Sequence, residues 1–239
     1  MATSGITIQQ LSRDDIINAA LRKLVVIGEG QTANATQITT AAQALNALVA
    51  EFRTLGMSLW ARKTYQLTLV TSQQNYTFGV GQAENTAYPL RIYTANLLQP
   101  PDFDTKIIVN PLSFTDFSLL PNGSTGVPVN YTYQPKINQG VVSVWPIPDS
   151  GVTAGTLIEF TYQAPFEYFT TGVDTPDFPE EWNNALIYGL AYLLCDEFGV
   201  ADAKINRIAK QADLHLSLAL SGGTEEASMY IQRDWAGDY

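Results

Sequence analysis

The sequence predicts an α+β fold: a four-helix domain formed by both chain ends, an inserted antiparallel β domain of sandwich or barrel type, and an extended C-terminal arm. Three observations predict this organisation. Apolar residues recur at helical spacing near both ends, short alternating segments separated by Pro and Gly fill the middle, and the last residues have no periodicity. The expected divisions are residues 1–61 and 177–223 for the helical domain, 62–176 for the β domain, and 224–239 for the arm.

Two helices are expected in the N-terminal quarter of the chain. Ser12 and Asp15 have the spacing of a capping box. Behind them one helix face carries apolar residues at steps of three and four: Ile17, Leu21, Leu24 and Ile27. Gly28 is expected to end this helix. The second helix has a similar stripe, consisting of Leu45, Leu48, Phe52 and Leu55. Gly56 is its expected stop, and helices joined by so short a connector usually lie antiparallel.

The middle of the chain has the period of β-strands. Alternating or β-branched segments are bounded by turn residues at 65–70, 75–78, 90–97, 106–109, 127–133, 141–145 and 157–162. Several short strands with turn signals between them are typical of a small antiparallel sandwich or barrel. One helical turn is expected within this region, at 114–120.

The helical period returns after residue 176. Asp177 is the expected N-cap of a third helix, with Pro179 and two glutamates in the first turn. A fourth helix is expected over 202–220, ending at the Ser-Gly-Gly step 221–223. The remaining segment has no periodicity, yet it contains four large side chains: Tyr230, Ile231, Trp235 and Tyr239. Four large apolar or aromatic side chains are unusual in a terminal segment that makes no contacts.

Composition and charge exclude several function classes. The chain has 239 residues, 46% of them hydrophobic, and a net charge of −10. Between residues 64 and 203 the only basic residues are Arg91, Lys106 and Lys136, so a surface that grips phosphates is not expected there. The net negative charge favours one of two functions: it keeps the protein soluble, or it forms a surface past which DNA moves without binding. No apolar run is long enough to cross a membrane.

Metal, cofactor and catalytic sites are not expected. A single cysteine, Cys195, and a single histidine, His215, rule out cysteine-based zinc sites and multi-histidine sites. The adjacent acids 180–181 and 196–197 lie on expected helices, where neighbouring side chains diverge by about 100°. Glycoside hydrolysis would therefore need acids that the fold brings together from loops. The loop acids are Asp102, Asp104, Asp174 and Asp177.

Aromatic residues on the expected strands leave a second alternative open. They are Tyr76, Phe78, Tyr131, Tyr133, Trp145, Phe160 and Tyr162. Exposed together on one sheet face, they would form a platform for carbohydrate or a receptor. Packed in the core or between subunits, they would have the more common use of aromatic residues in sheets.

The helical ends resemble the head-to-tail adaptor proteins of short-tailed bacteriophages, also described as tail accessory factors or packaged-DNA stabilisation proteins. The motifs that carry the resemblance are the helix 15–24 before a glycine and a polar loop, Ala44-Leu-Asn-Ala-Leu48, Gly56-x-x-Leu59-Trp60, Asp177-Phe-Pro-Glu-Glu-Trp-Asn-Asn-Ala-Leu186, Gly189-Leu-Ala191 and Phe198-Gly199. The resemblance spans most of the chain in element order, and its matched residues lie in the helices.

This resemblance implies a structural virion protein at the head–tail junction, assembled in the host cytoplasm. It implies a ring of twelve copies beneath the portal protein, through which packaged DNA passes without sequence-specific binding, and a contact with the next tail protein, a nozzle or hub. In the family the C-terminal segment docks on the portal. The residues expected to bind it here are Tyr230, Ile231, Arg233, Trp235 and Tyr239. Some relatives are reported to degrade peptidoglycan, so a virion hydrolase is the alternative.

Overall fold

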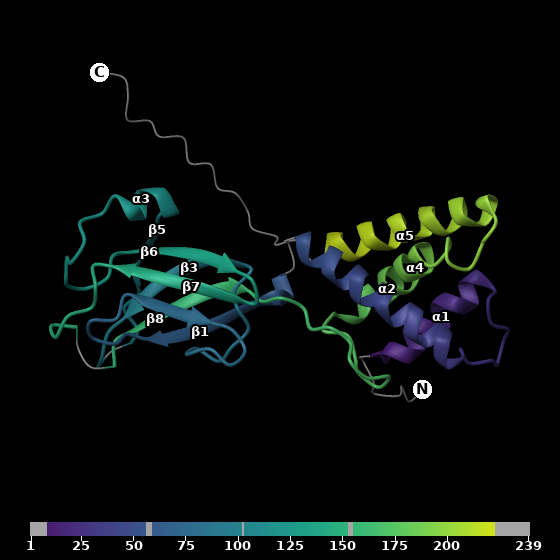
Figure 1. Cartoon of the computed structure of the whole chain (residues 1–239), viewed down its shortest axis with the longest axis horizontal. Helices are drawn as coiled ribbons and strands as arrows, with labels where there is room; N and C mark the ends of the chain where they lie inside the picture. Colours follow the sequence, from purple (N-terminus) through teal and green to yellow (C-terminus); the bar gives the residue numbers. More distant parts are fainter. Residues whose placement is uncertain (1–8, 56–58, 102, 153–154, 223–239) are drawn as a thin grey trace, which may run out of the picture.

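The computed structural model describes residues 9–55, 59–101, 103–152 and 155–222. The helices of both chain ends gather in one part of the molecule and the strands in another, and the two parts lie end to end (Figure 1). The mixture of helices with two largely antiparallel sheets confirms the α+β class. We call these regions the helical part and the β part.

The helical part begins with α1 (Arg13–Leu24) and α2 (Ala35–Thr54). The capping box of α1 is confirmed: the Asp15 amide donates to the Ser12 hydroxyl at 3.2 Å, and the Ser12 amide donates to the Asp15 carboxylate at 3.2 Å. α1 ends before the expected Gly28, because Val25 adopts a left-handed conformation with φ of 61°. A second capping box, between Asn34 and Gln37, starts α2.

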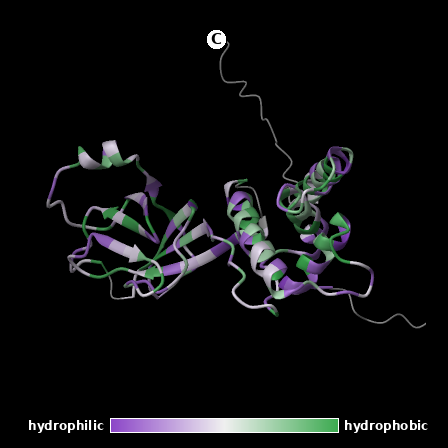
Figure 2. Ribbon diagram, turned by 45° about the vertical axis from the view of Figure 1, so that its right-hand side comes forward, coloured by the Kyte–Doolittle hydropathy of each residue, from purple (hydrophilic) through white to green (hydrophobic). Residues whose placement is uncertain are grey.

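The C-terminal half of the helical part contains α4 (Asn183–Leu193) and α5 (Asp202–Gly222). The expected cap at Asp177 is wrong. A 3₁₀ turn, η2 (Glu180–Trp182), precedes α4, and its N-cap is Pro179, which has no side chain able to cap. α5 continues two residues beyond the expected end, into the Ser-Gly-Gly step. Figure 2 shows polar and apolar residues on the same helices, as expected for helices that bury one face.

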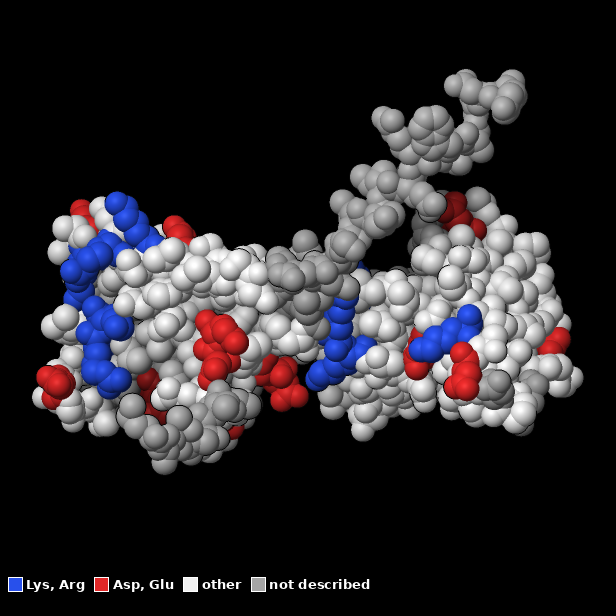
Figure 3. All heavy atoms as spheres, turned by 180° about the vertical axis from the view of Figure 1, so that it is seen from behind, with Lys and Arg blue, Asp and Glu red and all other residues white. Residues whose placement is uncertain are grey.

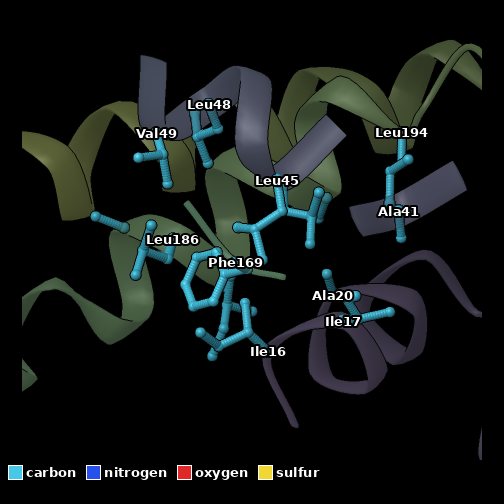
Figure 4. Close-up of a cluster of buried hydrophobic side chains, with 14 of the residues drawn as sticks. Ile16, Ile17, Ala20, Ala41, Leu45, Leu48, Val49, Phe169, Leu186 and Leu194 are labelled. Atoms are coloured by element: carbon cyan, nitrogen blue, oxygen red, sulfur yellow. The ribbon is translucent and has the colours of Figure 1, made fainter. Parts of the chain in front are cut away.

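One hydrophobic cluster joins the four long helices. It includes Ile17 of α1, Leu45 of α2, Leu186 of α4 and Ile208 of α5, each almost fully buried. Figure 4 shows Phe169, which belongs to none of these helices, among their side chains. Phe169 follows the last strand, and the sequence assigned it to the β domain. Phe166 and Phe169 both pack in the helical cluster although they follow closely on β8.

The β part contains two four-stranded sheets. The first has the order β1 (Arg62–Thr68), β8 (Leu157–Gln163), β3 (Arg91–Leu98) and β4 (Ile107–Ile108). The second has the order β2 (Asn75–Phe78), β7 (Gln139–Trp145), β6 (Asn130–Lys136) and β5 (Asn110–Pro111). All neighbours are antiparallel except β5 and β6, which are parallel. The sequence did not indicate β5. The expected helical turn is α3 (Phe114–Ser118).

Both sheets contribute to a second hydrophobic cluster. Phe160 of β8 lies edge-on to Phe78 of β2 and Tyr131 of β6, with ring centroids 6.3 and 5.8 Å apart. These contacts join the two sheets. Among the aromatic residues proposed as a platform, five are at most 3% exposed: Tyr76, Phe78, Tyr131, Phe160 and Tyr162. Their burial favours a packing role over a carbohydrate surface.

Candidate assembly surfaces and the junction between the two parts

The residues expected to bind the portal lie outside the described residues: Tyr230, Ile231, Arg233, Trp235 and Tyr239. The structure does show where α5, the helix before these residues, ends. α5 starts at the far end of the helical part and runs back toward the sheets, so its last turn, at Gly222, lies near the junction of the two parts (Figure 1). α5 therefore ends near the middle of the molecule.

The chain crosses the junction twice. It leaves α2 through the 3₁₀ turn η1 (Leu59–Ala61), enters β1, and returns from β8 through residues 164–178, which we call the crossing segment. The two crossings are joined directly, because the Ala164 amide donates to the Ala61 carbonyl at 3.0 Å. The junction therefore consists of two segments that are hydrogen-bonded to each other.

Aromatic side chains pack on both crossings. Trp60 stacks on Phe166 with centroids 4.8 Å apart, and it lies 5.2 Å from Phe178 and 5.8 Å from Trp182. Phe52 of α2 closes the group, 5.5 Å from Trp182. Such pairs contribute about 0.5–1.5 kcal/mol each beyond the burial of their surface. The aromatic cluster therefore ties both crossings to the helical core.

Polar side chains of α2 hold the crossing segment by its backbone. Asn46 donates its amide N–H to the Phe169 carbonyl and accepts from the Phe169 amide, both at 3.0 Å. Arg53 donates to the Phe166 carbonyl and, at 2.8 Å, to the Tyr168 hydroxyl, and its guanidinium lies 3.9 Å from the centre of the Tyr168 ring. Because the bonds to Phe169 and Phe166 go to backbone atoms, they fix the path of the segment.

The start of α1 binds the same segment. The amides of Arg13 and Asp14 donate to the carbonyls of Asp174 and Gly172, at 2.8 and 3.2 Å. The Asp174 carboxylate in turn accepts bonds from the hydroxyls and amides of Thr170 and Thr171. These bonds, led by that of the Thr171 hydroxyl, hold the pKa of Asp174 far below its usual value. Asp174 therefore stabilises a turn, and its lowered pKa keeps the carboxylate ionised, which does not suit a general acid.

The other loop acids considered for catalysis are Asp177, Asp104 and Asp102. Partial desolvation raises the pKa of Asp177, although part of its side chain stays exposed. The nearby Lys63 opposes that rise, and the Glu167 carboxylate adds to it. Asp104 lies in a turn of the β part, and Asp102 lies outside the described residues. In the described ranges, no three His, Cys, Asp or Glu side chains lie close enough together to hold a metal ion.

An exposed apolar surface lies at one edge of the β part. Six large apolar residues of α3, the edge strand β4 and the neighbouring segments contribute to it, each between 39% and 79% exposed: Ile107, Ile108, Phe114, Leu119, Val127 and Val129. The sequence did not indicate this surface. A five-residue helix with Phe114 at its start and Leu119 as its C-cap is too short to bury both side chains, and in the structure α3 buries no residue. Exposed apolar patches and open strand edges are typical of protein–protein contacts.

Comparisons with known proteins identify a family. The family model described as "SU10 adaptor protein" matches residues 12–232, from the N-cap of α1 to beyond the end of α5. A search of curated proteins finds no match to this chain. None of the helices in the described part of the chain is long and apolar enough to span a bilayer.

Proposed function

This chain belongs to the SU10 adaptor protein family, and from that premise we propose how a bacteriophage head-to-tail adaptor of this structure works. The family makes it a structural component of the virion. Beyond that, we propose that twelve copies form a ring beneath the portal protein, extend the DNA channel, help to retain packaged DNA and present a surface to the next tail protein. Assembly in the host cytoplasm precedes incorporation at the head–tail junction.

The observation that carries this proposal is the extent of the family match, which covers the helical part, the β part and the first residues of the arm. The structure adds support. A doubly crossed junction suits a protein that must transmit load between the capsid and the tail. The apolar edge around α3 provides a surface for a neighbouring copy or for the next tail protein. Ring symmetry then multiplies modest contacts into a durable attachment.

We expect the free protein to be a monomer or a weak oligomer that becomes a ring on the portal, because its largest expected anchors lie in the arm. Sedimentation velocity with and without portal, followed by electron microscopy of the mixture, measures this. The expected result is a large species with rotational symmetry in the mixture alone. A ring of the same size without portal would contradict templated assembly.

We also expect no hydrolysis of peptidoglycan by the purified protein. The Asp174 carboxylate accepts the hydrogen bonds of its own turn. The Glu159 carboxylate accepts bonds from Lys106 and, at 3.3 Å, from the Gln66 amide, so both acids are engaged in structural contacts. Zymography on cell-wall substrate measures this, with lysozyme as the positive control. A cleared band that disappears in an Asp177→Ala variant with unchanged circular dichroism would show instead that the protein is a virion hydrolase.

A further inference from the structure

The far end of the helical part contains a small pocket between α1, α4 and α5. Its volume is about 240 Å³, and its walls are formed by Lys23, Tyr188, Arg207, Ile208 and Gln211. Lys23 belongs to the last turn of α1, whereas the other residues come from α4 and α5. The pocket is thus created by the packing of helices from opposite ends of the chain.

The wall of the pocket is ordered by ring contacts. Tyr188 stacks on His215 with centroids 4.9 Å apart and an interplanar angle of 19°. Lys23 places its Nζ atom 5.1 Å from the centre of the Tyr188 ring. Arg207, Gln211 and His215 follow one another at intervals of four along α5, so they share one face of that helix. A cation, an amide and an aromatic ring therefore line one continuous surface.

The surroundings of the pocket are basic, although the chain as a whole carries a net charge of −10. Arg22 lies beside Lys23, and Lys204 and Lys210 flank Arg207 along α5. Figure 3 shows Lys and Arg gathered at this end of the molecule, on the left of that view. No carboxylate oxygen of a described residue lies within 4.0 Å of Lys23 or Arg207. An anion from outside the chain would relieve the repulsion among these cations.

We propose that this pocket binds a glutamate or aspartate side chain of an acidic peptide segment in a partner protein. The carboxylate accepts charge-assisted hydrogen bonds from Arg207 and Lys23, while the amide of Gln211 supplies a further donor. The stem of the bound side chain packs on Ile208 and the Tyr188 ring. The proposal does not depend on ring formation, since a single copy of the chain contains the whole pocket.

The shape of the site favours an acidic peptide over nucleic acid. Phosphate backbones are gripped by basic tracks that follow a strand over many charges. Here the two cations converge on a concave space of about 240 Å³ whose floor includes a buried isoleucine. That space accommodates one side chain. The acidic stretch between residues 64 and 203, which includes most of the β part, the crossing segment and α4, repels a long polyanion.

The test uses the full chain and a fluorescein-labelled hexaglutamate peptide, with binding followed by fluorescence anisotropy at low salt. Lys23→Gln combined with Arg207→Gln removes both cations of the pocket. Arg22→Gln combined with Lys210→Gln is the matched control, since it removes the same charge without touching the lining. Gln211→Trp fills the pocket and leaves the net charge unchanged. Circular dichroism verifies the fold of each variant.

We expect the pocket double variant and Gln211→Trp each to weaken peptide binding by about tenfold or more, the effect of losing one or two charge-assisted bonds. The control is expected to weaken binding by less than about threefold. Equal weakening in both double variants, or no saturable binding by the unaltered protein, overturns the proposal. Tighter binding of a labelled DNA duplex than of the peptide also overturns it and assigns the surface to nucleic acid.

Discussion

Replacing Trp60, which is partly buried against the helical cluster, with alanine is expected to lower the free energy of unfolding by about 3 kcal/mol, the lower end of the range for removing a large aromatic side chain. Trp60 contacts Phe166, Phe178 and Trp182, which belong to the return crossing and to the turn that starts α4. Its loss leaves a cavity where both crossings meet. We expect the damage to spread along the crossing segment, since its backbone bonds to Asn46 and Arg53 rely on the same packing.

Urea unfolding measures the change in stability, and amide hydrogen exchange measures protection in residues 164–178. Trp145→Ala is the matched control: Trp145 lies on β7, away from the junction, and its indole donates to the Pro121 carbonyl at 3.3 Å. We expect the control to leave exchange in 164–178 unchanged. If both variants lost the same stability and neither changed that exchange, the aromatic cluster would not be the element that couples the two parts.

Deleting residues 224–239 is expected to abolish most portal binding while leaving the fold intact. Among the described residues, the hydrophobic cluster of the helical part is formed by side chains up to Ala219 and Leu220 of α5, and the arm follows the Ser-Gly-Gly step 221–223. Large aromatic side chains and arginine are the residue types that dominate binding energy at interfaces, and a single such anchor typically contributes about 2–4 kcal/mol. Loss of four large anchors and one arginine should therefore weaken binding by more than a hundredfold, even after ring avidity.

Pull-down with purified portal and electron microscopy of the mixture measure this effect. Trp235→Ala is the milder companion, and in the assembled ring its effect is partly masked by the other copies. Circular dichroism and thermal melting check that the truncated chain still folds. A folded, truncated protein that assembles on portal as well as the full chain does would remove the arm from the proposed mechanism.

Local signals were enough to predict most elements. The capping box at Ser12, the apolar stripe of α2 and the alternation in β8 are read from neighbouring residues, and each appears in the structure. The end of α1 was not predictable in this way, because a left-handed valine such as Val25 is rare outside a specific context. β5 was missed because two residues in a parallel pair leave almost no pattern.

The candidate functional surfaces are formed by residues far apart in the sequence. The spacing of residues along one sequence does not reveal such contacts. Lys23 and Arg207 form one pocket although nearly the whole chain separates them. The family resemblance was nevertheless correct, because its motifs lie in helices whose order along the chain is itself informative. The expected portal-binding residues remain a prediction, since they lie outside the described residues.

The insertion of the β part between two helix pairs has a consequence for biosynthesis. The strands of both sheets are complete once residue 163 has left the ribosome, so the β part can fold while the C-terminal helices are still being translated. Before α4 and α5 emerge, α1 and α2 can pack only on each other, and apolar residues such as Ile16 and Leu45 are left partly exposed to water or a chaperone. The nascent chain is therefore most prone to aggregation late in translation, just before α4 and α5 emerge and cover it.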